Sequence, residues 1–262
     1  MKITWHGTAT LTVESGGTKI LFDPFLKRNK KLPAVDVDSL SEANAAFITH
    51  PHFDHFCDVQ AFTDAGLPVV YGSAQCVKLA KENGFSARTF RKLQLIEPFE
   101  EVRIGRLRVT AYPAVHCRFN AANTFASMFN VKNSLKLKSL FTVFKTHRKF
   151  PLGEGNETYA FEVTDGQKRV FILGSAGLKE GVEYPTDSDL LVFPYQGRTK
   201  MHLYAMPFIE KLQPKRVLAD HFDDAFPPVS RRVKAEKLVE ETARRFPSVT
   251  AFVPMENLPY EI

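Results

Sequence analysis

The chain has 262 residues, of which 44% are hydrophobic and 24% are charged. This length and composition are typical of a globular protein with a large buried core, and they exclude a disordered chain or a small disulfide-stabilised scaffold. The formal net charge of +6 favours anionic partners such as phosphate-bearing molecules, nucleic acid or membrane surfaces, although a basic surface is as often only solvated.

Cysteine usage and the start of the chain predict a cytoplasmic protein. Cys57, Cys76 and Cys117 are odd in number and far apart, so they do not form a disulfide framework. The opening MKITWHGTATLTVESGG alternates like a strand and contains no apolar export signal. No apolar run reaches the roughly 18 residues that a transmembrane segment needs.

The first half of the chain predicts a run of strands followed by alternating strands and helices. Strands are expected in KITWH, TLTVES and TKILFDP, with a turn at Gly16-Gly17 between the last two. After a polar loop, the apolar run AAFITH predicts a buried strand that ends at His50. FCDVQAFTDAGL and AQCVKLAKENGF predict helices on either side of a strand in PVVYGS. A hairpin that turns at Gly105 then ends on His116.

The second half repeats this layout after an interruption at residues 118–156. TYAFEVTD and KRVFILGSA predict strands about a turn at Asp165-Gly166. DLLVFPYQG and KRVLADH predict buried strands, the second ending at His221, and TAFVPM closes a sheet. Helices are expected in HLYAMPFIEKLQP and VSRRVKAEKLVEETARRF. Two halves of similar layout predict a single domain over residues 1–262, with 118–156 as an insertion.

Three histidines each follow the C-terminal end of a predicted strand: His50, His116 and His221. In layered α/β folds this edge is where loops converge to build sites. A single histidine elsewhere is more economically explained as a polar residue with a hydrogen-bond partner, and this applies to His6, His147 and His202.

The segment ITHPHFDHFCD combines metal-binding side chains at close spacing. His50 and His52 are two residues apart in an extended segment and point the same way, so both can reach one metal ion. Asp54 and His55 lie one turn further on and project to a neighbouring position. Imidazole and carboxylate are ligands that zinc prefers, and no packing argument explains this density. The segment therefore predicts a metal site.

These motifs resemble the metallo-β-lactamase superfamily of binuclear metallohydrolases. The stretches that carry the resemblance are ITWHGTATLTVESGGTKILFDPF, THPHFDH, VTAYPAVH and LQPKRVLADHFDDAFPP, and the likeness covers most of the chain outside 118–156. The chain is most similar to the branch that includes the L-ascorbate-6-phosphate lactonases and the N-acyl-phosphatidylethanolamine phospholipase D. The resemblance implies an α/β fold of four layers, an αβ/βα sandwich with two mixed sheets face to face, helices outside and metals at one edge.

The resemblance also implies one or two metal ions, zinc or alternatively manganese or iron. The first ion would be held by His50, His52 and His116, and the second by Asp54, His55 and His221. The implied reaction is hydrolysis by a metal-bound hydroxide, because a metal lowers the pKa of bound water towards about 7 and polarises the scissile oxygen. Asp54 and His116 are the implied catalytic residues, with Asp54 also orienting the water.

The turn that usually carries a bridging aspartate in this family departs from the pattern. It reads LGSAG, which places Ser175 where the carboxylate should be, and Asp187 and Asp189 open the next strand instead. The change removes one negative charge between two dications only about 3.5–4 Å apart. We therefore expect the second ion to bind more weakly, or to need a bridging hydroxide or a substrate phosphate.

A second departure lies near the start of the chain. Gly7-Thr8-Ala9 stands where the branch commonly has Gly-His-Ala, and the nearest histidine is His6. His6 either faces the site from the first strand or is a buried histidine with ordinary hydrogen bonds.

The insertion 118–156 directly follows His116 and is predicted to form a cap over the metals. Its phenylalanines alternate with lysines and arginines, which suits an anionic substrate with an apolar part, such as a phospholipid or acylated phosphodiester. Alternatively, the phenylalanines only dock the segment on the sandwich while the lysines are solvated. Arg118, Asn120 and Arg198 are candidate substrate contacts, with a surface role as the alternative.

Together these features predict a cytoplasmic metallohydrolase that acts on a phosphodiester, a phosphorylated lactone or a related ester, with peripheral membrane contact compatible with the insertion. One alternative is a catalytically weakened metal-binding protein that senses a phosphorylated ligand, which the serine at position 175 favours. A nuclease of the same superfamily ranks lower, because the chain has no dedicated RNA-binding module. A true β-lactamase is disfavoured by the absence of an export signal.

Overall fold

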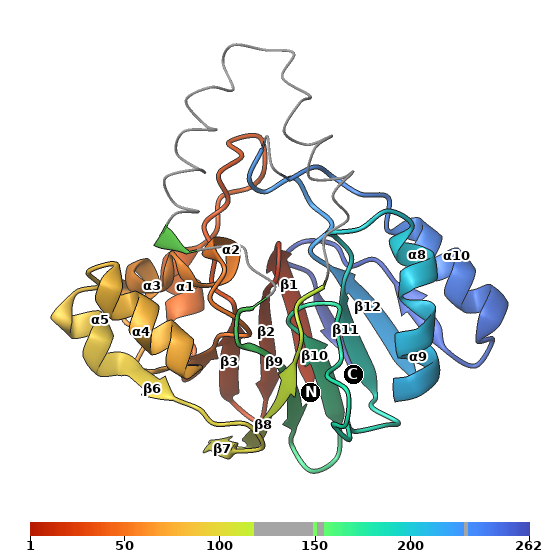
Figure 1. Cartoon of the computed structure of the whole chain (residues 1–262), viewed down its shortest axis with the longest axis horizontal. Coiled ribbons are helices and arrows are strands. Elements are labelled where there is room, and N and C mark those ends of the chain that lie inside the picture. Colours follow the sequence, from red (N-terminus) through yellow and green to blue (C-terminus); the bar gives the residue numbers. More distant parts are fainter. Residues whose placement is uncertain (118–148, 151–154, 228–229) are drawn as a thin grey trace.

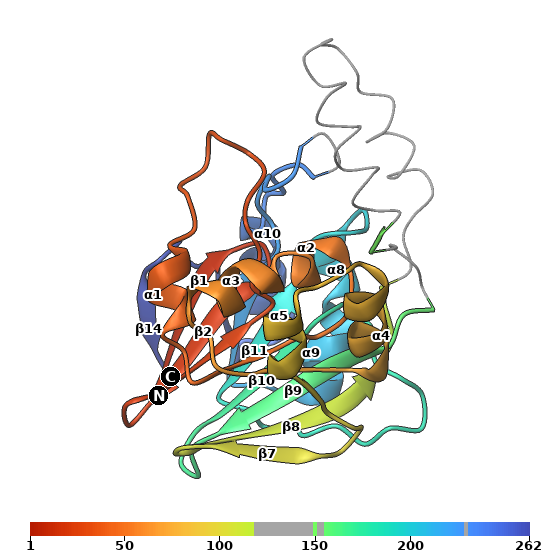
Figure 2. The same cartoon turned by 90° about the vertical axis from the view of Figure 1, so that its left-hand side faces the viewer.

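The computed structural model describes residues 1–117, 149–150, 155–227 and 230–262. In this part of the chain, two seven-stranded sheets pack face to face, with helices on their outer sides (Figures 1 and 2). The predicted four-layer αβ/βα sandwich with two mixed sheets is confirmed. The predicted insertion 118–156 lies almost wholly outside the described residues.

The first sheet has the strand order β14-β1-β2-β3-β4-β5-β6. Its strands are β1 (Lys2–Gly7), β2 (Thr10–Ser15), β3 (Thr18–Phe22), β4 (Ala45–Phe47), β5 (Val70–Gly72), β6 (Leu93–Leu95) and β14 (Pro259–Glu261). Strands β1, β2 and β3 form an antiparallel meander, and β3 to β6 run parallel. Its associated helices are α1 (Val37–Ser41), α2 (Phe53–Phe56), α3 (Val59–Ala65), α4 (Ala74–Glu82) and α5 (Ala87–Lys92).

The second sheet has the order β13-β12-β11-β10-β9-β8-β7. Its strands are β7 (Glu101–Ile104), β8 (Leu107–Ala114), β9 (Thr158–Thr164), β10 (Arg169–Leu173), β11 (Leu190–Pro194), β12 (Arg216–Asp220) and β13 (Thr250–Phe252), and its helices are α8 (Met201–Tyr204), α9 (Met206–Leu212) and α10 (Glu236–Arg245). Strands β8 to β10 are antiparallel and β10 to β13 are parallel, as in the first sheet. The two sheets thus share the duplicated layout expected from the sequence.

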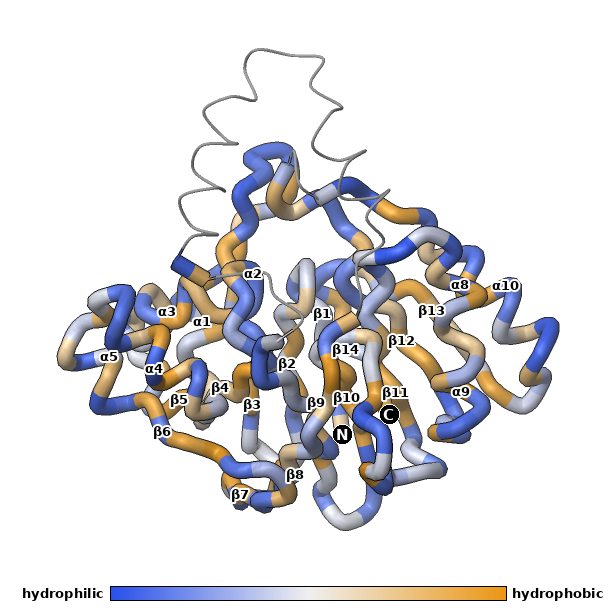
Figure 3. Tube along the Cα trace, in the orientation of Figure 1, coloured by the Kyte–Doolittle hydropathy of each residue, from blue (hydrophilic) through white to orange (hydrophobic). Residues whose placement is uncertain are grey.

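Burial on both faces explains why the parallel strands are apolar along their whole length. All five residues of β11, LLVFP, are buried, because the other sheet covers one face and helices cover the other. The hydropathy colouring shows the same continuous apolar runs along β10 to β12 (Figure 3). Phe161 of the second sheet contacts Phe22 and Phe47 of the first, with ring centroids 5.7 and 5.6 Å apart. Burying each such ring stabilises the fold by about 1.5–3 kcal/mol.

Several short elements differ from the prediction. Helices α1, α2 and α5 and strand β14 are three to six residues long, too short for a complete apolar period. The last helix begins at Glu236 instead of Val229, because the preceding residues pair elsewhere: the Val233 N–H donates to the Phe222 carbonyl, 2.8 Å away. No helix within the described ranges is long and apolar enough to span a membrane.

Candidate metal centre

The structure brings together all six residues predicted as metal ligands, at the edge of the sandwich where β4, β8 and β12 end. They form two triads in which the potential ligand atoms lie within 4.8 Å of one another. The first triad is His50, His52 and His116, and the second is Asp54, His55 and His221. Five of the six side chains are buried, and His221 is partly exposed.

The first triad gathers ring nitrogens of three histidines around a common point. The Nδ1–H of His50 donates to Thr49 Oγ1 at 2.9 Å, so its Nε2 is left to face His52 Nδ1, also 2.9 Å away. The Nδ1–H of His116 donates to the Cys117 carbonyl at 2.8 Å, which directs its Nε2 towards the triad. Such hydrogen bonds fix the tautomer and the ring orientation of metal-binding histidines.

Burial keeps the imidazoles of His50 and His116 neutral. It lowers the pKa of His50 well below its usual value, with further lowering by the neighbouring histidines. It lowers the pKa of His116 to about 4, against the raising effect of the Cys117 carbonyl. A histidine must be neutral to bind a metal, so His50 and His116 are in the ligating form at neutral pH.

The second triad combines one carboxylate with two imidazoles. His221 Nε2 lies 3.0 Å from Asp54 Oδ2, and His55 Nε2 lies 3.8 Å from the same oxygen. Burial raises the pKa of Asp54, but the imidazoles of His55 and His221 outweigh burial and lower it overall. Burial lowers the pKa of His221. The hydrogen bond with Asp54 and the charge of Asp54 outweigh burial and raise this pKa to about 9.

The second triad fits a metal ion on the chemistry of its donors. Asp54 is 4% exposed, and its Oδ1 has no hydrogen-bond partner among the described residues. A buried, ionised carboxylate with an open oxygen is costly unless a cation or a donor is bound there. His221 Nδ1–H donates to Gln196 Oε1 at 3.0 Å, so Nε2 is the atom that would ligate. Zinc, manganese and iron all accept this combination of imidazole and carboxylate.

Asp23 is a supporting residue that the sequence analysis did not identify. It directly follows β3 at the same edge, which was the available signal. Its carboxylate accepts hydrogen bonds from His55 Nδ1 at 2.8 Å and from the Thr49 N–H and hydroxyl at 2.8 and 2.6 Å. Asp23 therefore orients His55 directly and His50 through Thr49.

Thr8 supports His221 from the opposite sheet. Its carbonyl accepts hydrogen bonds from the His221 N–H and from Trp5 Nε1, both at 2.8 Å. Trp5 also stacks on Phe222, with ring centroids 4.6 Å apart. Thr8, which stands where the branch commonly has a histidine, thus holds the residue that follows β12 through its backbone carbonyl.

Two residues at the departures from the family pattern, Ser175 and His6, form hydrogen bonds with residues outside the two triads. The Ser175 hydroxyl accepts a hydrogen bond from the Cys117 N–H at 2.9 Å, so it holds the backbone that follows His116. His6 bonds Asn257 Oδ1 at 2.7 Å and Thr12 Oγ1 at 3.0 Å, as a histidine with ordinary hydrogen bonds does. Asp189 accepts from Lys215 and from the Arg169 N–H, both at 2.9 Å, at the start of β11.

The candidate substrate contacts are only partly described. Arg198 lies over the Tyr204 ring, with its guanidinium carbon 4.6 Å from the ring centroid. Arg118 and Asn120 fall outside the described residues, as does His147. Phe150 is buried against Phe56, with ring centroids 5.9 Å apart, which agrees with the docking role for that one phenylalanine.

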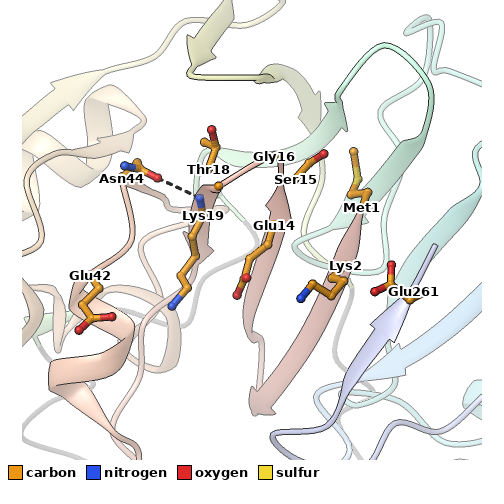
Figure 4. A pocket seen from close by; sticks show the side chains of 11 residues that line it. Met1, Lys2, Glu14, Ser15, Gly16, Thr18, Lys19, Glu42, Asn44 and Glu261 are labelled. Carbon is orange, nitrogen blue, oxygen red and sulfur yellow. Dashed lines mark hydrogen bonds between the residues drawn. The ribbon is translucent and has the colours of Figure 1, made fainter.

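A hollow of about 440 Å³ adjoins the first triad. It is lined by Val115, His116, Gly177, Leu178, Tyr204, Pro207, Phe208 and Lys211. A hollow of about 500 Å³ lies around the start of β1 and the turn between β2 and β3, where Lys2, Glu14, Lys19, Glu42 and Glu261 line it and no residue of either triad does (Figure 4). The larger of these two hollows is therefore not the one beside the candidate metal ligands, because only the smaller one is lined by a triad residue, His116.

Comparison with known proteins agrees with this geometry. The family model described as "Beta-lactamase superfamily domain" matches residues 2–221. A metal-dependent hydrolase from Salinibacter ruber is 25% identical over 239 residues, which cover 90% of both chains. A metal-dependent hydrolase from Flavobacterium johnsoniae is 34% identical over 87 residues, so that match spans 33% of this chain and only 38% of that protein.

A solved structure shows the same fold. The metallo hydrolase from the archaeon Ignicoccus hospitalis aligns with a TM-score of 0.63 at 16% identity, covering 100% of this chain and 98% of that one. At this level of identity the likeness concerns the fold alone.

Proposed function

The chain belongs to the β-lactamase superfamily. From this premise we propose that it is a metal-dependent hydrolase, that its two triads hold zinc ions and that it cleaves a phosphodiester, a phosphorylated lactone or a related ester. Manganese or iron is the alternative metal. The branch of the L-ascorbate-6-phosphate lactonases is the part of the superfamily that we propose for this chain.

The observation that carries this proposal is the pair of triads at one edge, with the open Oδ1 of buried Asp54 in the second of them. When bound, metal ions supply Lewis acidity and lower the pKa of a water molecule towards about 7. The protein side chains hold the geometry: Thr49, Asp23, Cys117 and Gln196 each fix a histidine by its second nitrogen. Asp54 Oδ1 can ligate, or accept a hydrogen bond from the attacking water and keep it oriented.

The hollow beside His116 supports a substrate with an apolar part and a negative charge. Its volume of about 440 Å³ falls in the range of small-molecule sites, and Leu178 and Phe208 give it apolar walls. Lys211 lines it, and Arg198 stacks on Tyr204, another lining residue. We propose that these two cations recognise an anionic group, with Arg118 and Asn120 as further proposed contacts. An acylated or aryl phosphate ester has both features.

The test is hydrolysis of bis(p-nitrophenyl) phosphate and of p-nitrophenyl esters by the zinc-loaded protein. We expect measurable turnover that chelation abolishes and zinc restores, and its loss in His52→Ala. His202→Ala in α8 is the matched control, because His202 belongs to neither triad, and it should keep wild-type turnover. Activity that survives both chelation and His52→Ala would refute the proposal.

A sensor of a phosphorylated ligand is the second candidate, favoured by the serine at position 175, which stands in place of a bridging carboxylate. This candidate predicts tight binding of a phosphorylated ligand to the zinc-loaded protein without turnover of any ester tested. A nuclease ranks third, and hydrolysis of single-stranded RNA or DNA under the same conditions would support it. The three free cysteines, Cys57, Cys76 and Cys117, agree with the cytoplasmic location that we propose.

A further inference from the structure

Strand β7 is the outermost strand of the second sheet. It pairs with β8 on one side, and no strand within the described ranges pairs with its other side. A free strand side carries unpaired backbone N–H and C=O groups, which can pair with a strand of another molecule. Figures 1 and 2 show β7 at the end of the sandwich away from α2, which carries Asp54 and His55, so a partner on β7 leaves the metal edge open.

Glu101 and Arg103 are the residues of β7 whose backbone groups face the free side. The Ala111 N–H of β8 donates to the Glu100 carbonyl at 3.1 Å, so Glu100 faces β8. Residues along an antiparallel strand alternate between hydrogen-bonding to the neighbouring strand and facing away from it. Val102 therefore faces β8 as Glu100 does, and Glu101 and Arg103 present their N–H and C=O groups outwards.

The side chains of Glu101 and Arg103 carry opposite charges that this chain does not neutralise. Both are exposed and, two residues apart, lie on the same face of the sheet. No ion pair among the described residues includes either of them. In the β7–β8 pair, Glu101 lies opposite the uncharged Thr110, and Arg103 lies opposite Arg108. Because like charges opposite one another repel, Arg103 lacks a favourable cross-strand neighbour.

The other edge strands of the two described sheets are less suited to pairing. Strands β6, β13 and β14 have three residues each, whereas β7 has four. Strand β14 also begins with Pro259, which has no N–H to donate. Edge strands that avoid association carry prolines or charges that repel an approaching strand. Strand β7 has no proline, and its two charges have opposite signs.

Phe99, two residues before β7, is an exposed aromatic residue with a strained backbone. It is 57% exposed, and its φ is 66°. This left-handed conformation costs a residue with a side chain about 1–2 kcal/mol. The Phe99 N–H donates to the Ala111 carbonyl at 2.7 Å, which fixes Phe99 at the beginning of the free side. Strain that holds an apolar ring in solvent is typical of a recognition surface.

We propose that β7 pairs with β7 of a second copy of this chain, antiparallel and about a two-fold axis at Val102. In this register Glu101 of each copy lies opposite Arg103 of the other, and the two exchange backbone hydrogen bonds. Two-fold registers centred on Glu101 or on Arg103 place like charges opposite each other instead. Phe99 of each copy then lies near the turn at Gly105 of the other. The second sheets of the two copies join into one continuous sheet.

The test is self-association of the purified full-length chain. Sedimentation velocity and light scattering are measured between about 1 and 200 μM, because a single pair of short strands gives a small interface. We expect the mass to rise with concentration from the 29.6 kDa of one chain to twice that value. Added salt should weaken the association, because it screens the pairs between exposed charges.

Charge variants test the register. Glu101→Arg and Arg103→Glu each place like charges opposite each other in both pairs, so each should weaken self-association by about 10-fold or more. The double exchange, Glu101→Arg with Arg103→Glu, restores opposite charges and should restore the wild-type association. An equimolar mixture of the two single variants should form a mixed dimer at concentrations where neither variant forms a dimer alone.

Lys237→Glu is the matched control. It reverses an exposed charge on α10, which packs against β13 at the far side of the same sheet, and self-association should not change.

Three outcomes would overturn the proposed dimer. They are a chain that stays monomeric at every concentration, a dimer that both single variants leave unchanged, and a dimer that the double exchange does not restore. Circular dichroism establishes that each variant is folded. If one single variant is not folded, the other single variant and the double exchange decide by the same measurements. None of these readouts depends on metal binding or turnover, so the proposed dimer and the proposed function stand or fall separately.

Discussion

The two edges of the sandwich use the left-handed backbone conformation in different ways. At the metal edge it is adopted by Thr8, Asp23 and His221, with φ of 51°, 44° and 54°. In the hairpin turns of the opposite edge it is adopted by glycines, namely Gly16, Gly17, Gly105 and Gly166, although Asp187 and Gln213 also adopt it before β11 and β12. A side chain in this conformation costs about 1–2 kcal/mol, which glycine avoids. The hairpin turns thus avoid this cost with glycine, whereas Thr8, Asp23 and His221 accept it at the metal edge, where Asp23 bonds His55 and the Thr8 carbonyl bonds the His221 N–H.

The two edges also differ in how they treat charge. At the metal edge, histidines and aspartates are buried against one another. At the opposite edge, the hollow of Figure 4 is lined by charges of both signs near the chain termini. Substitutions at the first edge should therefore affect metal binding and activity, and those at the second should affect only stability.

The largest effect is expected from His116→Ala, which removes a ligand of the first triad. We expect a fall in kcat/KM of about 1000-fold or more, because the group that activates water is lost with its ligand. Steady-state hydrolysis of bis(p-nitrophenyl) phosphate and zinc analysis of the same preparation provide the measurement. Retention of both zinc content and activity would remove His116 from the site.

Asp23→Asn should have the next largest effect. It weakens the hydrogen bond that orients His55, so zinc affinity should fall about 10–100-fold. Chelator competition measures this affinity. The partner experiment at the opposite edge is Asp165→Asn, since Asp165 also accepts several hydrogen bonds, and there zinc affinity should not change. Equal zinc affinities in the two variants would break the comparison between the edges.

Gly174→Ala should disturb the metal edge by crowding. A Cβ at Gly174 would lie 2.0 Å from Thr49 Cβ, and Thr49 holds both Asp23 and His50. We expect a loss of about 1–3 kcal/mol in unfolding free energy together with weaker zinc binding. Gly17→Ala at the opposite edge meets no atom within 4 Å and only strains φ, so it should cost about 1 kcal/mol without affecting zinc. Denaturant unfolding and zinc titration of both variants test this contrast.

The smallest effect is expected for Asp165→Asn, which should change the pH dependence of stability against unfolding. Burial raises the pKa of Asp165, but the hydrogen bonds from Ser15 and two backbone N–H groups outweigh it and lower the pKa to about 2. A depressed pKa stabilises the fold above the unfolded value of about 3.9, and this contribution is lost as pH falls towards 2. The wild type should therefore unfold a few degrees above the variant at pH 7, and the gap should close between pH 4 and 2. A gap of constant size across this range would contradict the assignment.

The sequence was informative wherever a pattern is local. The H-x-H-x-D-H spacing and the apolar runs that end at His50, His116 and His221 predicted a metal site where strand ends meet at one edge. The resemblance that these motifs carry implied the two triads and the mixed sandwich. Helix α10 and the short strand β14 were predicted poorly or not at all, since the backbone contacts that set their limits come from distant residues.

The sequence by itself determined the family, the sandwich fold and the side chains capable of holding metal, since these depend on residue type and on spacing along the chain. Only the tertiary structure decided which groups support them. It placed Asp23 under His55, tied Thr8 to His221 and turned Ser175 to the backbone of Cys117. Hydrogen bonding and burial depend on residues far apart in the chain, so no local pattern records them.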